Sequence, residues 1–214
     1  MNLSDFYFYF KEQINEKKCN DIISASKKKL VKAQVYANDD ELVNNFLKKD
    51  TKNNKKTSLN EKERTSKVCF ISHQWIYEIL HPLIHEANKK ANWNFEFSYT
   101  EPLQFTQYGL NEFYNWHQDC PTYPFKDTHP NFNGKIRKIS SITNLSKPGD
   151  YEGGDVEFDF RNLRKKSSNV RVCEEIKEQG SVVVFPSFIF HRVTPVTKGT
   201  RYSLVSWTLG NPWK

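Results

Sequence analysis

Short stretches of β-branched and aromatic residues dominate the chain from Asn94 onward, and glycine, proline and asparagine separate them. Such stretches favour strands, and many short strands without intervening helices are typical of a sandwich or barrel rather than a parallel βαβ fold. We therefore expect a mainly β roll with helices packed outside it. The predicted strands read FEFSYT, LQFTQYG, KISSITNL, DVEFDF, SVVVF, HRVTPV and RYSLVSW.

The clearest helical pattern follows a short apolar strand that we predict at Lys67–Ile71. Apolar residues recur there at spacings of three and four, at Ile76, Ile79, Leu80, Leu83, Ile84 and Ala87. This spacing predicts an amphipathic helix. Because proline clashes with the preceding turn, Pro82 predicts a kink or break within it. His81 and His85 are expected to be ordinary histidines of the helix surface, since two ligands leave a metal under-coordinated.

The region before that helix is polar and rich in lysine. A first helix is predicted over about Ser4 to Lys32 from the spacing of its apolar residues. The stretch KKDTKNNKK at Lys48–Lys56 is expected to be a solvated loop. The residues of the first helix face are Phe10, Ile14, Ile22 and Ile23, and a further short helix is predicted around Leu42, Val43, Phe46 and Leu47.

Length and composition narrow the class of protein. The 214 residues include 16 Phe, 10 Tyr and 5 Trp, enough for one domain with a sizeable core. We expect a helical, lysine-rich part at residues 1–93 and a β core at residues 94–214. No apolar run of membrane-spanning length and no signal-peptide pattern is present, so we expect a cytoplasmic protein with no membrane partner. The four cysteines form no CxxC pair and are expected to be free thiols.

Candidate chemistry begins at YNWHQDCP, Tyr114 to Pro121. On a strand, His117 and Asp119 point to the same face. Two ligands hold a metal weakly, and His191, between two later strands, is the best candidate for a third. Two histidines and one carboxylate make the facial triad of non-haem Fe(II) oxygenases, which leaves open positions on an octahedral iron for a bidentate 2-oxo acid and dioxygen.

Arg201 adds a further link, ten residues after His191. On one strand, Arg201 and Ser203 share a face. A guanidinium that points inward needs an anionic partner, because an unpaired buried charge is costly. The far carboxylate of 2-oxoglutarate would be such a partner, held by a bidentate fork with help from the Ser203 hydroxyl.

These elements resemble a known family. HQD at His117–Asp119, the later His191 and RYS at Arg201–Ser203 are similar to the His-x-Asp, His, Arg-x-Ser pattern of the 2-oxoglutarate- and Fe(II)-dependent dioxygenases. The prolyl 4-hydroxylase-like (PKHD-type) group is the most similar. The resemblance extends over roughly Leu103 to Trp207, and its further segments are QYGLNEFYNWHQD, RKISSITNLSKPGDYEGGDVEF and GSVVVFPSFIFHRVTPVTKGTRYSLVSW.

The resemblance implies a double-stranded β-helix, that is, a jelly-roll barrel with iron at its open end. It also implies that Tyr108 lies near the cosubstrate and that Tyr114 lines the pocket. By strand alternation, however, Tyr114 should point away from the ligands unless a bulge turns it inward. Some members carry a second cosubstrate-binding tyrosine in the strand matched by ISSITNL, where Thr143 or Asn144 are the candidates to replace it.

The implied activity is hydroxylation of an unactivated C–H bond, with Fe(II), 2-oxoglutarate and O2 as cofactors and ascorbate as a further candidate. The implied substrate is a peptide or protein, proline first, with a small molecule as an alternative. The loop Cys120–Lys138 is a candidate substrate-facing lid. One rival is oxidative demethylation of nucleic acid, which the second arginine of those enzymes disfavours because Trp207 stands at its place. The other rival is a non-enzymatic jelly-roll binding module.

Overall fold

The computed structural model describes residues 3–33, 62–160 and 169–213, and these form a mainly β fold with two α-helices. The predicted short helix near Leu42 and the lysine patch Lys48–Lys56 lie outside the described residues. The helical elements are η1 (Leu3–Asp5), α1 (Glu16–Ser26), η2 (Lys27–Lys29), α3 (Gln74–Lys90) and η3 (Glu174–Ile176). No helix among the described residues is long and apolar enough to span a membrane.

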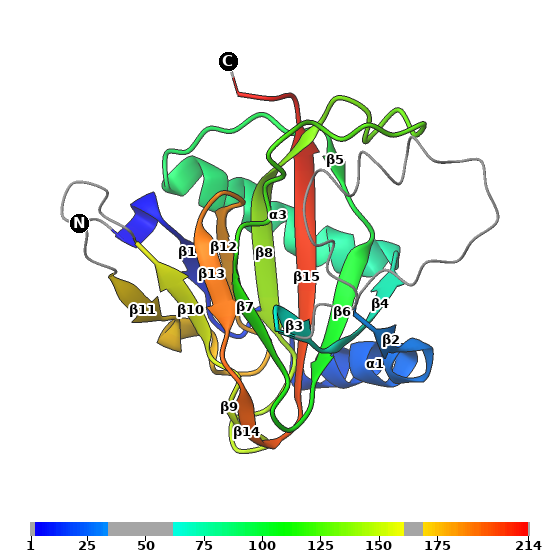
Figure 1. Cartoon of the computed structure of the whole chain (residues 1–214), viewed down its shortest axis with the longest axis vertical. Coiled ribbons are helices and arrows are strands. Elements are labelled where there is room, and N and C mark those ends of the chain that lie inside the picture. The colour runs from blue at the N-terminus through cyan, green and yellow to red at the C-terminus, as the bar shows by residue number, and fades with distance from the viewer. Residues whose placement is uncertain (1–2, 34–61, 161–168, 214) are drawn as a thin grey trace.

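Two antiparallel sheets form the roll (Figure 1). The larger has the order β1-β12-β8-β15-β6-β4-β2, with β5 also paired to β15, and the smaller has the order β11-β10-β13-β7-β3, while β14 pairs with β9. The strands are β1 (Phe8–Phe10), β2 (Val31–Lys32), β3 (Arg64–Thr65), β4 (Lys67–Ile71), β5 (Tyr99–Thr100), β6 (Leu103–Tyr108), β7 (Phe113–His117), β8 (Ile136–Asn144), β9 (Tyr151–Gly153), β10 (Val156–Asp159), β11 (Val170–Val172), β12 (Val182–Pro186), β13 (Phe190–Val193), β14 (Val196–Gly199) and β15 (Arg201–Gly210).

Two hydrophobic clusters follow from this layering. The first joins α1 and α3 to one face of the large sheet, with Ile22, Ile76, Leu80, Phe105 and Leu204 among its members. Figure 1 shows α3 crossing behind the large sheet. The second cluster fills the space between the sheets and draws on β6, β8, β10, β12, β13 and β14. The predicted mainly β double-stranded β-helix with helices packed outside is therefore confirmed.

The N-terminal region departs from the sequence prediction. The helix predicted over Ser4–Lys32 is wrong in extent, because only Glu16–Ser26 is α-helical. Phe10, which we expected on the helix face, belongs to β1, and this strand pairs with β12 through Phe8, Tyr9 and Phe10. Tertiary pairing of an aromatic run has overridden the local helical spacing. Because β1 to β4 all lie within residues 1–93 and pair with later strands, that part also contributes to the barrel's sheets.

The helix α3 runs without interruption from Gln74 to Lys90, so of the predicted kink or break at Pro82 the break is wrong. Pro82 is exposed, whereas Ile76, Leu80, Leu83, Ile84 and Ala87 are buried against the sheet. Burial of this apolar face outweighs the loss of one backbone hydrogen bond. The strand predicted at Lys67–Ile71 is confirmed with those bounds. The predicted strand FEFSYT is confirmed only at its end, as β5.

Two glycines with positive φ, Gly180 and Gly134, allow a stability test of the contact between Ile14 and the turn at Gly180. Gly180 has φ +80°, and a Cβ there would overlap the carbonyl oxygen of Ile14, whose amide donates to Gly180 at 3.1 Å. Gly134 has a similar φ of +72° but nothing within 4 Å of an added Cβ. We expect Gly134→Ala to cost about 1–2 kcal/mol through its backbone conformation alone. Gly180→Ala should cost clearly more in urea unfolding, and equal losses would contradict the packing of residues 11–14 on this turn.

Candidate metal centre

Three side chains converge on the small sheet, at the end of β7 and on the neighbouring strand β13. His117 is the last residue of β7, Asp119 follows two residues later, and His191 lies on β13 directly opposite His117. Residues directly opposite in an antiparallel pair place their side chains on the same face. The Nε2 atom of His117 lies 3.8 Å from Asp119 Oδ1, and the Nε2 atom of His191 lies 3.6 Å from Asp119 Oδ2.

Backbone carbonyls orient both imidazoles. His117 Nδ1 lies 2.7 Å from the carbonyl oxygen of Asn115, and His191 Nδ1 lies 3.0 Å from that of Ile189. A carbonyl oxygen only accepts, so each Nδ1 carries the proton and each Nε2 presents a lone pair. Metal-binding histidines show this arrangement, in which the second nitrogen fixes the ring and its tautomer.

Asp119 is held by its backbone and leaves its carboxylate available. Its amide donates to the carbonyl oxygen of Ser187 at 2.9 Å. The carboxylate is buried, and its Oδ2 has no hydrogen-bond partner. A buried oxygen without a partner is costly, which is the expected condition of a metal ligand before its metal arrives.

The charge states suit a divalent cation. Burial, and next the neighbouring His191, lower the pKa of His117 to about 3, so this imidazole is neutral at neutral pH. Burial acts to raise the pKa of Asp119, but His191, His117 and Arg137 together outweigh it, and the net pKa is lowered. Two imidazoles and one carboxylate, with ligand atoms all within 4.8 Å of one another, are the donor set that suits Fe(II).

The ring of Tyr114 stacks on His117, with centroids 3.5 Å apart and an angle of 13° between the planes. Simple alternation had directed Tyr114 away from the ligands. The register between β13 and β7 shifts, however, so that His191 opposes His117 while Val193 opposes Tyr114. This leaves an extra residue on β7, which is the bulge that an inward Tyr114 requires.

Removing the Tyr114 ring should loosen the first histidine. We expect Tyr114→Ala to weaken Co(II) or Fe(II) binding about 10-fold, as losses of groups that orient a metal ligand do. Tyr114→Phe keeps the stacked ring and should bind metal within about twofold of wild type on the same grounds. Calorimetric titration of each variant measures this, and an equal loss in both variants would show that the hydroxyl, not the stacking, matters.

The predicted cosubstrate residues lie together on the large sheet. Arg201 opposes Tyr108, and Ser203 opposes Thr106, in the pairing of β15 with β6. Arg201, Ser203 and Tyr108 are each at most 3% exposed, and the Arg201 guanidinium carbon lies 5.8 Å from the centre of the Tyr108 ring. The Nη1 atom of Arg201 is buried without a hydrogen-bond partner. A buried guanidinium with a spare donor fits an anionic ligand that is bound by a fork.

Neither of the two residues expected to replace the second cosubstrate-binding tyrosine is placed to contact the cosubstrate. Thr143 opposes Leu204, which belongs to the helix-facing cluster, so the Thr143 side chain lies on the far face of the sheet. Asn144 opposes Ser203, but its amide nitrogen donates to the carbonyl oxygens of Ser146 and Lys177. The expectation that Thr143 or Asn144 supplies this contact is therefore wrong.

Other predicted features have plain structural roles. Within the described ranges, the triad is the one group of three or more His, Cys, Asp or Glu side chains that could hold a metal. His81 lies 3.0 Å from the Thr100 hydroxyl, and His85 is exposed beside Phe97. Gln118 is exposed and donates to the carbonyl oxygen of Phe188, in keeping with its predicted outward orientation. The four cysteines are free, as expected.

Two arginines lie near the triad that the sequence did not indicate, Arg137 and Arg64. Arg137 makes a bidentate ion pair with Glu101, at 2.6 and 2.9 Å, and its guanidinium lies 3.9 Å from the Trp207 ring centre. Arg64, on β3, lies over Tyr114 with its guanidinium carbon 4.5 Å from the ring centre. The sequence carries no local signal for either, because both contacts join segments that are distant along the chain.

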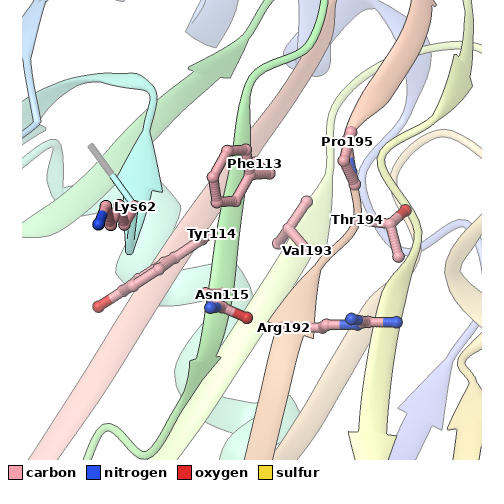
Figure 2. Close-up of a pocket in the computed structure, with 8 residues that line it drawn as sticks. All are labelled: Lys62, Phe113, Tyr114, Asn115, Arg192, Val193, Thr194 and Pro195. Atoms are coloured by element: carbon pink, nitrogen blue, oxygen red, sulfur yellow. The ribbon is translucent and has the colours of Figure 1, made fainter. Parts of the chain in front are cut away.

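A shallow pocket of about 320 Å³ lies along the neighbouring strands β7 and β13. Figure 2 shows Tyr114 extending towards Lys62, while Arg192 extends to the opposite side. None of the three triad residues lines this pocket, and neither do Tyr108, Arg201 or Ser203. It therefore lies beside the candidate metal centre and is distinct from it.

Comparisons with known proteins agree with this geometry. The sequence model of the 2OG-Fe(II) oxygenase superfamily matches residues 103–209. A PKHD-type hydroxylase of Hyphomonas neptunium is 33% identical over 117 residues, which cover 51% of this chain and 46% of that protein. The chain thus spans about half the length of the curated relatives it matches.

Solved structures resemble the fold over nearly the whole chain. The viral collagen prolyl hydroxylase of Paramecium Bursaria Chlorella virus-1, in its 2OG complex, matches with a TM-score of 0.60 at 14% identity and covers 96% of each chain. A prolyl-4-hydroxylase of Pseudomonas putida matches with a TM-score of 0.59 at 16% identity, over 98% of this chain and 96% of that one. At such identities the likeness supports the fold.

Proposed function

This chain belongs to the 2OG-Fe(II) oxygenase superfamily, and we propose that it is an Fe(II)- and 2-oxoglutarate-dependent hydroxylase of peptidyl residues, proline first. One observation supports this most. A buried carboxylate oxygen of Asp119 lacks a partner beside two oriented imidazoles, and a buried nitrogen of Arg201 lacks a partner in the same barrel. The Asp119 carboxylate would bind the metal ion that chelates the 2-oxo acid, and the Arg201 guanidinium would bind the distal carboxylate of that acid.

In the proposed site, His117, Asp119 and His191 hold the iron. Iron held there would supply activation of dioxygen, so that 2-oxoglutarate and O2 would give succinate and CO2 while one oxygen atom hydroxylates a C–H bond. The chain supplies the rest. The carbonyl oxygens of Asn115 and Ile189 keep both Nε2 atoms facing the metal. Burial of Asp119 and His191, beside a half-buried His117, limits the access of bulk water to the reacting groups.

Arg201 binds the distal carboxylate of 2-oxoglutarate in this proposal. Its side chain packs on Gly154, where an added Cβ would lie 3.0 Å from Arg201 Cδ. This close approach fixes the stem of the arginine, and Ser203 and Tyr108 add hydroxyls from the neighbouring register positions. Gly154 therefore serves the site by holding the Arg201 side chain in place.

A peptide substrate is supported by the relatives and by the loop after the triad. One solved structure with the same fold is that of a viral collagen prolyl hydroxylase. The predicted loop Cys120–Lys138 is too long, because β8 begins at Ile136. The loop at residues 120–135 leaves directly from Asp119, and its Tyr123 is 66% exposed. Loops carried on a rigid barrel are where substrate contacts concentrate. We propose that this loop covers a bound peptide.

The experiment that tests the proposed function measures succinate formation with Fe(II), 2-oxoglutarate and oxygen. Peptide libraries with and without proline are compared, and mass spectrometry detects a gain of one oxygen atom. We expect succinate release to rise with proline-containing peptides, with one hydroxylated product per succinate. A protein that binds Fe(II) but never consumes 2-oxoglutarate, whatever the peptide, would refute the proposal.

The lid can be tested separately from the chemistry. We expect Tyr123→Ala to lower peptide-stimulated turnover about 5- to 30-fold, the effect of losing 1–2 kcal/mol from an aromatic contact. Peptide-free decay of 2-oxoglutarate should stay unchanged, because Tyr123 lies outside the metal centre. If both rates fell equally, the loop would instead support the metal centre.

A further inference from the structure

We infer that Arg64 is a second cation of the 2-oxoglutarate pocket, which binds the distal carboxylate together with Arg201. The inference rests on the proposed function and adds a residue from outside the matched range, 103–209. Arg64 comes from β3 at the edge of the small sheet, while Arg201 comes from β15 of the large sheet. The two guanidinium groups therefore reach the barrel interior from opposite sheets.

The position of Arg64 is fixed by contacts on both sides. Its Nε donates to the Ser66 hydroxyl at 2.6 Å, and its guanidinium lies over Tyr114, the ring that stacks on His117. In the strand register, Arg64 opposes Tyr114. A continuous stack therefore joins Arg64 through Tyr114 to the first metal ligand, which places the cation at the wall of the metal centre.

Arg64 retains a donor that the fold does not use. It is 7% exposed, and its Nη2 is buried without a hydrogen-bond partner, as is Nη1 of Arg201. Neither arginine forms an ion pair with any residue that the structure describes. Two buried cations with spare donors are costly on their own. One carboxylate, with its four lone-pair positions, satisfies donors from both.

Tyr108 marks where the two arginines meet. It opposes Arg201 in the β6–β15 register. The Arg201 guanidinium carbon lies 5.8 Å from the Tyr108 ring centre. Burial raises the pKa of Tyr108, while the charges of Arg64 and Arg201 and a hydrogen bond with Arg64 act to lower it. Because Thr143 faces the helices and Asn144 is engaged elsewhere, neither residue takes the place of the second cosubstrate-binding tyrosine, and one donor to the carboxylate is still to be assigned besides Arg201, Ser203 and Tyr108. Arg64 supplies it.

The test compares two acids that differ only at the distal end. Fe(II)-loaded protein is titrated without oxygen, using 2-oxoglutarate or 2-oxopentanoate, which has a methyl group in place of the distal carboxylate. We expect Arg64→Gln to weaken 2-oxoglutarate about 10- to 100-fold, the range for hydrogen bonds to a charged group. Binding of 2-oxopentanoate should change by less than about threefold, and Arg64→Lys should restore part of the loss.

Arg192→Gln is the matched control, since Arg192 pairs with Glu157 and lies over Trp116 on the neighbouring strand. It should bind both acids as wild type does. Equal weakening of the binding of both acids by Arg64→Gln, or no weakening of either, overturns the inference. If Arg64→Gln does not fold, the same comparison is made with Arg64→Lys. Wild-type protein that binds neither acid would refute the proposed function itself. Wild-type binding that persists unchanged in the Arg64 variants would refute only the role of Arg64.

Discussion

Replacing His191 with alanine should lower Fe(II) affinity by more than about 100-fold and abolish succinate formation. Loss of a partner that merely orients a metal ligand costs about 10- to 100-fold, so loss of a ligand costs more. His191 is 3% exposed and directly opposes His117. No other histidine or carboxylate of the described residues joins this cluster to take its place. The remaining pair would hold a metal too weakly to retain it.

The matched control for this variant is His85→Ala. His85 is exposed on α3 and contacts Phe97, so its removal should leave metal affinity unchanged. Anaerobic calorimetry with Fe(II) measures both variants, with thermal unfolding as the check on folding. Wild-type affinity in His191→Ala would show that the metal, if any, binds elsewhere in the protein.

Replacing Arg201 with glutamine should remove most of the binding of 2-oxoglutarate while leaving Fe(II) bound. Truncating one partner of a buried, hydrogen-bonded charge pair costs about 2–5 kcal/mol, or roughly 30- to 5,000-fold in affinity. Arg201 is 2% exposed and leaves a nitrogen without a partner. The larger loss is expected here than at Arg64, because Gly154 and the β15 register hold the Arg201 stem in place.

Titration of metal-loaded Arg201→Gln with 2-oxoglutarate measures this loss, and Fe(II) binding by the same sample is the internal control. Arg201→Lys keeps the charge but not the planar fork, so it should bind with intermediate affinity. Unchanged affinity in Arg201→Gln would mean that the distal carboxylate meets another group.

The clustering of the three proposed metal ligands could be predicted because their signal is local or carried by order along the chain. Strand alternation predicted a shared face for His117 and Asp119, although β7 ends at His117, and His191 follows near the start of a later strand. The structure brings the three together within 4.8 Å. The β core was predictable for a similar reason, since alternation and glycine-rich turns mark its strands.

Contacts that depend on register could not be predicted in the same way. The inward ring of Tyr114 requires a bulge on β7, and one extra residue in a strand leaves no trace in its composition. Thr143 was misjudged because the face that it occupies depends on the pairing of β8 with β15. Phe8–Phe10 pairs with β12 from the far end of the chain, so local helical spacing was misleading there.

Arg64 shows the limit most clearly. It lies before the matched range, in a lysine-rich region, and nothing in its neighbouring residues marks it as part of a site. Only the pairing of β3 with β7 places it over Tyr114. The structure indicates a role for Arg64 because its Nη2 is buried without a hydrogen-bond partner.

The most direct measurement is a crystal structure of the protein grown without oxygen in the presence of Fe(II) and 2-oxoglutarate. We expect one metal ion bound by His117 Nε2, Asp119 and His191 Nε2, with the 2-oxo acid chelated to it and its distal carboxylate on Arg201. A metal bound away from these three residues, or 2-oxoglutarate with its distal carboxylate away from Arg201, would contradict the proposed site.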